Sequence, residues 1–306
     1  MEMDMSFMNI SMSRTKKRCL SFEQHPFGLP EPILYYLKKN SNPKLLLKLM
    51  QISKYFCFKE FSYMVVKDLK YMGTKWIYCK PKYNFKSEVL DLSNLKIPFV
   101  IHNGLNCDTE DVSLVSSFLS KVIVCDITKL RLVNQIITLN EFKLLISSGN
   151  VKRFSFFHSH VEYENGEIVP IDEIMKFIRN VTEFRWYLDT SMMSTFNSES
   201  VQNLIKVINH FILKTFCLMN IPETFDFNLF ATFMDKNPQI YYYLNFDILV
   251  PRKYSNMLQK FVDKKIATSS KKPFLLKIDF PRQNEESVKQ LESLYNFYSD
   301  RQNGMH

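Results

Sequence analysis

The residue types with the most obvious chemical potential lie in one short segment, His158-Ser159-His160-Val161-Glu162-Tyr163-Glu164. Alternate residues of a strand point to the same side, so two imidazoles and two carboxylates could converge on a metal ion. Phe154 and Phe156 share the parity of the histidines, however, and are expected in the core. We therefore favour a polar loop that ends in a small hairpin at Asn165-Gly166, and we expect no metal and no other cofactor.

The sequence also lacks the patterns of the common enzyme classes. Its 6 glycines do not form the loops that bind dinucleotides or nucleoside triphosphates. It contains neither G-x-S-x-G nor H-E-x-x-H. The 6 cysteines stand singly, without a C-x-x-C pair, and Cys125 beside Asp126 is expected as a small core residue. We therefore expect no enzymatic activity.

Composition indicates a folded protein whose charges are dispersed. The hydrophobic fraction is 46%, and the chain contains 27 Phe, 15 Tyr and 2 Trp. The net charge of +9 comes from 40 basic and 31 acidic residues spread along the chain, so we expect solvated charged faces and no nucleic-acid partner. Single cysteines, no secretory signal and only short apolar stretches predict a cytoplasmic or nuclear protein without a membrane span.

A strand-like pattern, apolar-x-x-apolar-x-apolar, recurs at intervals of about 30 residues. Its copies are Leu119-x-x-Val122-x-Val124, Val151-x-x-Phe154-x-Phe156, Val181-x-x-Phe184-x-Trp186, Leu213-x-x-Phe216-x-Leu218 and, more weakly, Pro238-x-x-Tyr241-x-Tyr243. A helical pattern follows each of these strand-like pieces. Asn150, Asn180 and Asn237 lie between a helix and the next strand, where we expect left-handed residues that end the helix.

A repeated strand-plus-helix unit of this length predicts an α/β fold, an irregular leucine-rich-repeat-like solenoid over residues 85–301. Parallel strands would form one sheet, with the helices on its outer side and the aromatic residues in the core. An ordinary doubly wound α/β sheet is the alternative. We favour the solenoid because the strand pattern keeps its internal spacing and no glycine is placed to build a nucleotide-binding turn.

The amino-terminal part of the chain has a different character. Residues 1–24 read as a flexible leader, rich in Met and Ser. Residues 25–60 carry short helical patterns that begin at Leu29-Pro30, and residues 61–84 are expected to connect this helical unit to the repeats. A helical unit this small buries little apolar surface alone, so we expect it to pack on a neighbour or a partner chain.

This helical unit resembles an F-box in the segments Leu29-Pro30-Glu31-Pro32-Ile33-Leu34-Tyr35-Tyr36-Leu37, Leu45-Leu46-Leu47-Lys48-Leu49 and Ile52-Ser53-Lys54-Tyr55-Phe56. The later segments Cys125-Asp126, Leu130-x-Leu132, Gln135-Ile136-Ile137 and Glu141-Phe142 resemble the large nematode-expanded family of F-box-like proteins with irregular leucine-rich-repeat-like carboxy-terminal regions.

The resemblance implies a non-catalytic adaptor. Its amino-terminal helices would bind the Skp adaptor of a cullin-RING ubiquitin ligase, and its solenoid would bind a protein substrate. The residues that the resemblance assigns to the adaptor interface are Leu29, Pro30, Ile33, Leu34, Leu45, Leu49 and Ile52. The alternative is a stand-alone protein-binding scaffold in which these helices only cap the repeats.

Overall fold

The structure is a computed structural model that describes residues 30–40, 45, 48–49, 63–79, 87–268 and 275–303. The chain divides into two units, residues 1–42 and 43–306. In the first unit, helix α1 (Glu31–Asn40) begins directly after Pro30, whose carbonyl accepts a 3.0 Å hydrogen bond from the amide of Ile33. The predicted leader and most of the predicted helical unit 25–60 lie outside the described residues.

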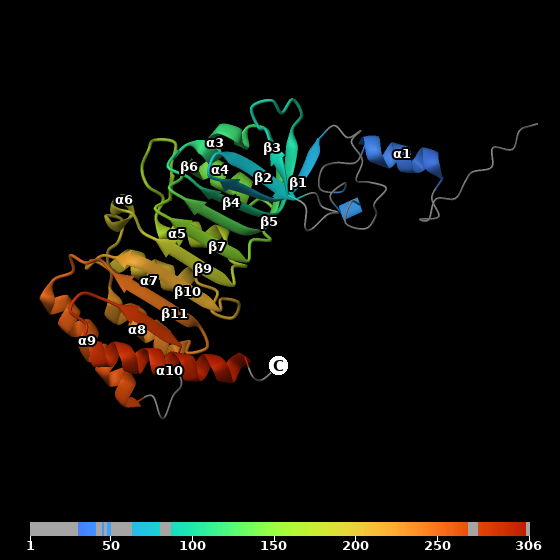
Figure 1. The fold of residues 1–306 in the computed structure, drawn as a ribbon. Helices are drawn as coiled ribbons and strands as arrows, with labels where there is room; N and C mark the ends of the chain where they lie inside the picture. Colours follow the sequence, from blue (N-terminus) through green and yellow to red (C-terminus); the bar gives the residue numbers. More distant parts are fainter. Residues whose placement is uncertain are drawn as a thin grey trace, which may run out of the picture. The chain divides into compact units, whose positions relative to one another are not determined.

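A ten-stranded sheet runs through the second unit in the order β12-β11-β10-β9-β7-β5-β4-β1-β2-β3 (Figure 1). Its strands are β1 (Met64–Met72), β2 (Lys75–Cys79), β3 (Ser87–Leu90), β4 (Phe99–Asp108), β5 (Val122–Val133), β7 (Arg153–Phe157), β9 (Glu183–Tyr187), β10 (Thr215–Ile221), β11 (Tyr241–Phe246) and β12 (Leu276–Asp279). The pair β1–β4 and all neighbouring pairs from β4 to β12 are parallel. Strand β2 pairs antiparallel with both β1 and β3. The predicted α/β class is confirmed.

The strand order follows the chain. From β4 to β12, each strand of the sheet lies beside the next one in sequence. A doubly wound sheet instead reverses its order at a switch point, and the described strands contain no such reversal from β4 onward. A second sheet consists of the short parallel strands β6 (Ile136–Thr138) and β8 (His160–Glu162).

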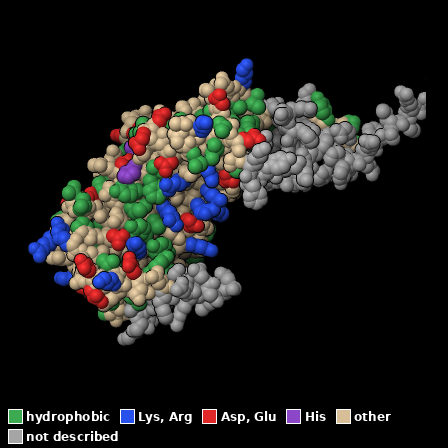
Figure 2. All heavy atoms as spheres, viewed as in Figure 1, with side chains coloured by type: hydrophobic (Ala, Val, Ile, Leu, Met, Phe, Trp, Pro, Cys, Tyr) green, Lys and Arg blue, Asp and Glu red, His purple; other side chains and the backbone are tan. Residues whose placement is uncertain are grey.

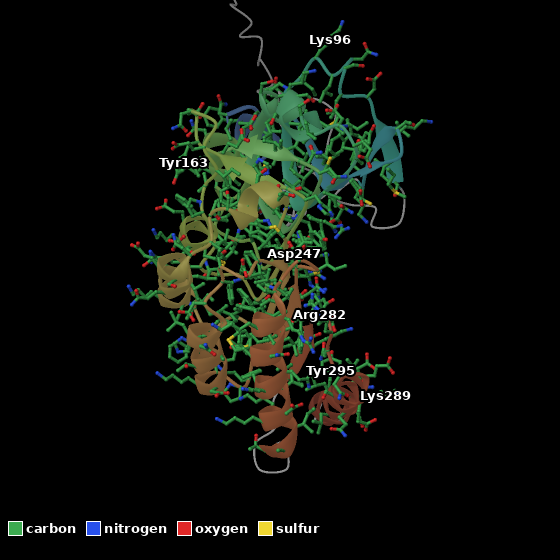
Figure 3. All side chains as sticks on the ribbon, turned by 90° about the vertical axis from the view of Figure 1, so that its left-hand side faces the viewer. Lys96, Tyr163, Asp247, Arg282, Lys289 and Tyr295 are labelled. Atoms are coloured by element: carbon green, nitrogen blue, oxygen red, sulfur yellow. The ribbon has the colours of Figure 1, made fainter. Side chains whose placement is uncertain are left out.

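Helices connect most of the strands and pack on one face of the sheet. They are α3 (Leu114–Leu119), α4 (Leu139–Leu145), α5 (Ile171–Phe177), α6 (Thr190–Met193), α7 (Ser198–Val207), α8 (Phe227–Lys236) and α9 (Arg252–Thr268). The last helix, α10 (Glu285–Asn303), follows β12 and lies on the opposite side of the sheet from α7 and α8 (Figure 3). Thr138 and Glu141 form a capping box at the start of α4, and Asp172 and Glu173 occupy the first turn of α5, where carboxylates interact favourably with the helix dipole.

The predicted aromatic core lies between the sheet and these connecting helices. The strand residues Phe154, Phe156, Phe184, Trp186, Phe216 and Leu218 are all fully buried, as predicted. Phe154 stacks on Phe184 with ring centroids 5.4 Å apart, and Phe184 stacks on Phe216 at 5.3 Å, so aromatic rings continue across three strands. Burial of such side chains is the main source of stability in a fold of this type.

For two copies of the strand pattern, the prediction of which residues occupy the core positions is wrong. On β5, the partners of Phe154 and Phe156 are Leu130 and Leu132, not Val122 and Val124. The cause is the length of β5, which has an irregularity in its pairing with β4 and so places two sets of apolar residues on one strand.

On β11, Tyr242 and Leu244 occupy the core positions, as partners of Phe216 and Leu218. The sequence predicted Tyr241 and Tyr243 there. Three consecutive tyrosines carry no information about which face is apolar, and a shift of one residue moves every side chain to the other face of the sheet. Tyr241 and Tyr243 therefore lie on the face opposite the core.

The sheet also begins earlier than predicted. Residues 61–84, expected to be a connector, contribute β1 and β2, and Val66 and Leu69 are fully buried in the core. Asp68 has a left-handed backbone, with φ of +52°, and the pairing of β1 with its neighbours shifts at this point. This irregularity breaks the apolar alternation that identifies a strand in the sequence.

The prediction that Asn150, Asn180 and Asn237 end helices in a left-handed conformation is wrong, because none of them has a positive φ. Asn237 follows α8 with φ of −128° and donates from its side chain to the carbonyl of Phe233 at 2.8 Å. Asn180 donates to the carbonyl of Gly149 at 3.2 Å, and it is Gly149 that has a positive φ of +69°. Left-handed asparagines occur instead within strands, at Asn103 in β4 and Asn220 near the end of β10, and directly after β5, at Asn134.

Candidate functional site

The residues assigned to the adaptor interface are described only in part. Pro30, Ile33 and Leu34 lie at or in α1, Leu45 and Leu49 are helical, and Leu29 and Ile52 lie outside the described residues. Ile33 is 46% exposed, and Tyr36, three residues later on the same helix, is 65% exposed. Residues three apart share one face of a helix. This face of helix α1 therefore presents two large apolar side chains to solvent.

The histidine segment forms the predicted hairpin but separates its two imidazoles. His158 is exposed and has a left-handed backbone with φ of +47°, which turns the chain away from β7. His160 begins β8 and is buried. The hairpin turns at Gly166, where φ is +81°. Among the described residues, no three His, Cys, Asp or Glu side chains form a group that could hold a metal ion.

His160 is held between two carboxylates. Its Nδ1 lies 2.6 Å from Oδ2 of Asp189, and its Nε2 lies 3.0 Å from Oε1 of Glu162. The hydrogen bond with Asp189 raises the pKa of His160 above its ordinary value, against the opposing effect of burial. Asp189 also accepts a 2.7 Å hydrogen bond from the amide of Met192 and so caps α6. Because both ring nitrogens are engaged, this clamp joins β8 to α6 and leaves neither nitrogen for a substrate.

The buried cysteines are unreactive by position. Cys107 and Cys125 are fully buried, and burial raises the pKa of each thiol to about 12. Cys217 is 3% exposed, and burial raises its pKa to about 11. The nucleophilic form of cysteine is the thiolate, so these three residues are protonated at neutral pH. The prediction that Cys125 belongs to the core is confirmed.

A different arrangement of side chains lies on the sheet face opposite the connecting helices (Figure 2). Strands β5, β7 and β9 each contribute three alternate residues to this face, in register with one another. We call these nine residues the open-face grid: Lys129, Arg131, Val133, Arg153, Ser155, Phe157, Glu183, Arg185 and Tyr187. Alternate side chains of a strand share a face, so the paired register places the nine side chains in three rows across the sheet.

The rows of the grid differ in chemistry. Lys129, Arg153 and Glu183 form the first row, and the second consists of Arg131, Ser155 and Arg185. Val133, Phe157 and Tyr187 form the third row, which Met219 continues on β10. The grid thus contains four cationic side chains and one carboxylate beside an apolar row. Figure 2 shows Lys and Arg side chains next to a band of hydrophobic ones on this side of the sheet.

Contacts within the grid fix its central side chains. The guanidinium carbon of Arg131 lies 4.5 Å from the centre of the Phe157 ring and its nitrogen 3.7 Å from Asp108. The Arg185 guanidinium lies 3.8 Å from Glu183. Such cation–aromatic and ion-pair contacts contribute little to stability at an exposed site but restrict the positions of long side chains. The arginines are therefore partly ordered without being buried.

Helix α10 borders this face at the edge of the sheet. The ring of Tyr295 on α10 lies 5.0 Å from that of Tyr241 on β11 (Figure 3). Between α10 and strands β11 and β12 lies a cleft of about 330 Å³, whose lining includes Lys277, Asp279 and Glu292. The helix covers the exposed edge of β12, which would otherwise offer unpaired backbone groups.

Sequence reasoning missed the grid, although a signal for it was present. The signal consists of the residues that alternate with the core residues on each strand. They are Lys129-x-Arg131-x-Val133, Arg153-x-Ser155-x-Phe157 and Glu183-x-Arg185-x-Tyr187. Only the register between strands makes one surface of these three short patterns.

Comparisons with known proteins do not assign this chain to a family. No family model matches it, and no curated protein matches it. Among the described residues, no helix combines the length and the apolar character needed to cross a membrane.

Proposed function

We propose that this protein is a non-catalytic recognition adaptor. Its second unit, an irregular leucine-rich-repeat-like solenoid, binds a protein substrate through the open-face grid. An F-box-like unit that includes α1 binds the Skp adaptor of a cullin-RING ubiquitin ligase. The observation that carries this proposal is the grid itself, a chemically mixed and accessible surface on a sheet whose other face is packed against helices.

The strand order supports the solenoid. Each unit from β4 to β11 adds one parallel strand beside the previous one and continues into a helix on the same side of the sheet. Left-handed residues at Asn134, His158 and Asn220 turn the chain out of the sheet at equivalent points. Stacked units of this kind extend one sheet face without interruption, which makes a broad surface for a macromolecular partner.

The environment of the chemically capable groups supports binding rather than catalysis. Both nitrogens of His160 are occupied by carboxylates, and burial keeps the thiols of Cys107, Cys125 and Cys217 protonated. In contrast, the grid residues are accessible and belong to paired strands. A rigid platform loses little conformational entropy when a partner binds, which favours affinity.

The exposed side chains of α1 support the adaptor interface. Ile33 and Tyr36 lie on one face of the helix and leave apolar surface in contact with water. An amphipathic helix gains free energy when it lays such a face into an apolar groove of a partner. This is the mode of binding that the resemblance to an F-box implies for Ile33.

Co-purification of the full chain with a purified Skp-type adaptor tests the proposal. We expect a stable complex with the unaltered chain and a loss of about tenfold or more in affinity for the double variant Ile33→Glu, Tyr36→Glu, because charge would enter an apolar interface. The matched control, Arg131→Glu with Arg185→Glu, should bind the adaptor normally. Absence of binding by the unaltered chain, or equal binding by the α1 variant, would favour the stand-alone scaffold in place of the ligase adaptor.

A further inference from the structure

The spacing of positive charge on the grid points to a particular kind of ligand. Lys129 pairs in register with Arg153, and Arg131 shares its row with Arg185. Neighbouring strands are about 4.8 Å apart, and residues two apart on one strand are about 7 Å apart. The four cations therefore cluster within a small area that spans three strands, at distances comparable to those between side chains of an extended peptide.

Carboxylates neutralise only part of this positive charge. Its one carboxylate, Glu183, lies 3.8 Å from Arg185, and Arg131 lies 3.7 Å from Asp108 at the edge of the grid. No carboxylate of the described residues lies within ion-pair distance of Lys129 or Arg153, both of which are exposed. A partner carboxylate would thus find two cations with no carboxylate in the described residues nearby, Lys129 and Arg153, beside two arginines whose positions are already restricted.

The aromatic residues favour a peptide over a nucleic acid. Binding to single strands uses aromatic faces on which successive bases stack. Here the guanidinium of Arg131 lies over the Phe157 ring and the His158 ring lies 4.2 Å from the Tyr187 ring, so part of each ring is already occupied and a smaller part stays exposed. The apolar row formed by Val133, Phe157 and Tyr187 instead provides contacts for the apolar side chains of a peptide.

We propose that the open-face grid binds an acidic, extended segment of the protein partner, with its carboxylates on Lys129, Arg131, Arg153 and Arg185 and its apolar side chains on the row of Phe157 and Tyr187. This inference rests on the proposed function, because it specifies the substrate that the recognition surface accepts. It makes the grid selective for charge: a basic or neutral segment of the same shape would leave the cations without partners.

Fluorescence anisotropy with the full chain tests this inference. The probes are a labelled peptide of Glu, Ser and Leu, the same peptide with Gln in place of Glu, and a single-stranded oligonucleotide. We expect the Glu peptide to bind, the Gln peptide to bind about tenfold more weakly or worse, and added salt to weaken binding of the Glu peptide.

A charge-matched pair of variants locates the site. Arg131→Glu with Arg185→Glu should lower the affinity for the Glu peptide by about tenfold or more. Lys260→Glu with Lys264→Glu changes the net charge equally on the exposed side of α9, and it should leave the affinity unchanged. Unfolding curves for both variants exclude a loss of fold as the cause.

Three results would overturn the inference: no binding of the Glu peptide, equal losses in the two variants, or tighter binding of the oligonucleotide through the same arginines. None of these results affects the adaptor experiment, which depends on Ile33 and Tyr36. Adaptor binding without peptide binding would retain the ligase role and remove the acidic substrate. Peptide binding without adaptor binding would retain the recognition surface and remove the ligase role.

Discussion

Strands β7 and β9 place aromatic side chains on both faces of one sheet, and the two faces use them differently. Phe156 and Trp186 point into the helix-covered face and are fully buried. Their chain neighbours Phe157 and Tyr187 point to the open face, where each remains partly exposed beside a side chain that covers its ring. Consecutive residues thus differ in role: one contributes to the core, and the other belongs to the face that we propose for recognition.

The largest expected effect is the difference in stability between alanine variants of Phe156 and Phe157. Phe156→Ala removes a fully buried ring and should lower the free energy of unfolding by about 3–5 kcal/mol, because both apolar burial and packing contacts are lost. Phe157→Ala should lower it by about 1 kcal/mol or less, since solvent already reaches this ring. Urea unfolding followed by circular dichroism measures both values. Similar losses for the two variants would contradict the division between the faces.

A smaller effect is the change of stability with pH that His160 causes. The raised pKa of His160 means that the folded state binds its proton more tightly than the unfolded state does. Its contribution to stability is therefore complete below the unfolded pKa of about 6.5 and is lost as the pH rises through the higher folded pKa. The stability advantage of the unaltered protein over His160→Gln should shrink from weakly acidic to alkaline pH.

Unfolding of both proteins across this pH range measures that difference. His210→Gln is a suitable control, since His210 contacts the ring of Phe211 and has no carboxylate partner among the described residues. If the difference in free energy of unfolding between the unaltered protein and His160→Gln stays constant with pH, the two carboxylates do not raise the pKa of His160.

The core strands of the repeat were predictable because the apolar residues of each strand alternate within one short segment of sequence. The copies that begin at Val151, Val181 and Leu213 have one apolar face each, and all three became core strands. The frame failed on β11, where Tyr241, Tyr242 and Tyr243 look alike in the sequence. It also failed on β5, and β1 was predicted to be part of a connector, because irregular pairing interrupts the alternation on both strands.

The candidate site was harder to predict for two physical reasons. The grid depends on register between strands far apart in sequence, which no single strand contains. The histidine segment depends on one left-handed residue, His158, and histidine adopts that conformation only occasionally. That turn sends His160 to Asp189, a partner from a later unit of the chain. The converging metal ligands considered from the sequence therefore do not form in the described residues.

Photo-crosslinking from the two sides of the sheet tests whether the acidic peptide binds to the open face. A photoreactive phenylalanine analogue would replace either Tyr187 on the open face or Phe177 on α5, a residue that is 40% exposed among the connecting helices. We expect position 187 to crosslink to the bound Glu peptide and position 177 not to. The crosslink from position 187 should be lost in the Arg131→Glu, Arg185→Glu variant. Crosslinking from position 177, or from 187 regardless of the two arginines, would contradict recognition by the open-face grid.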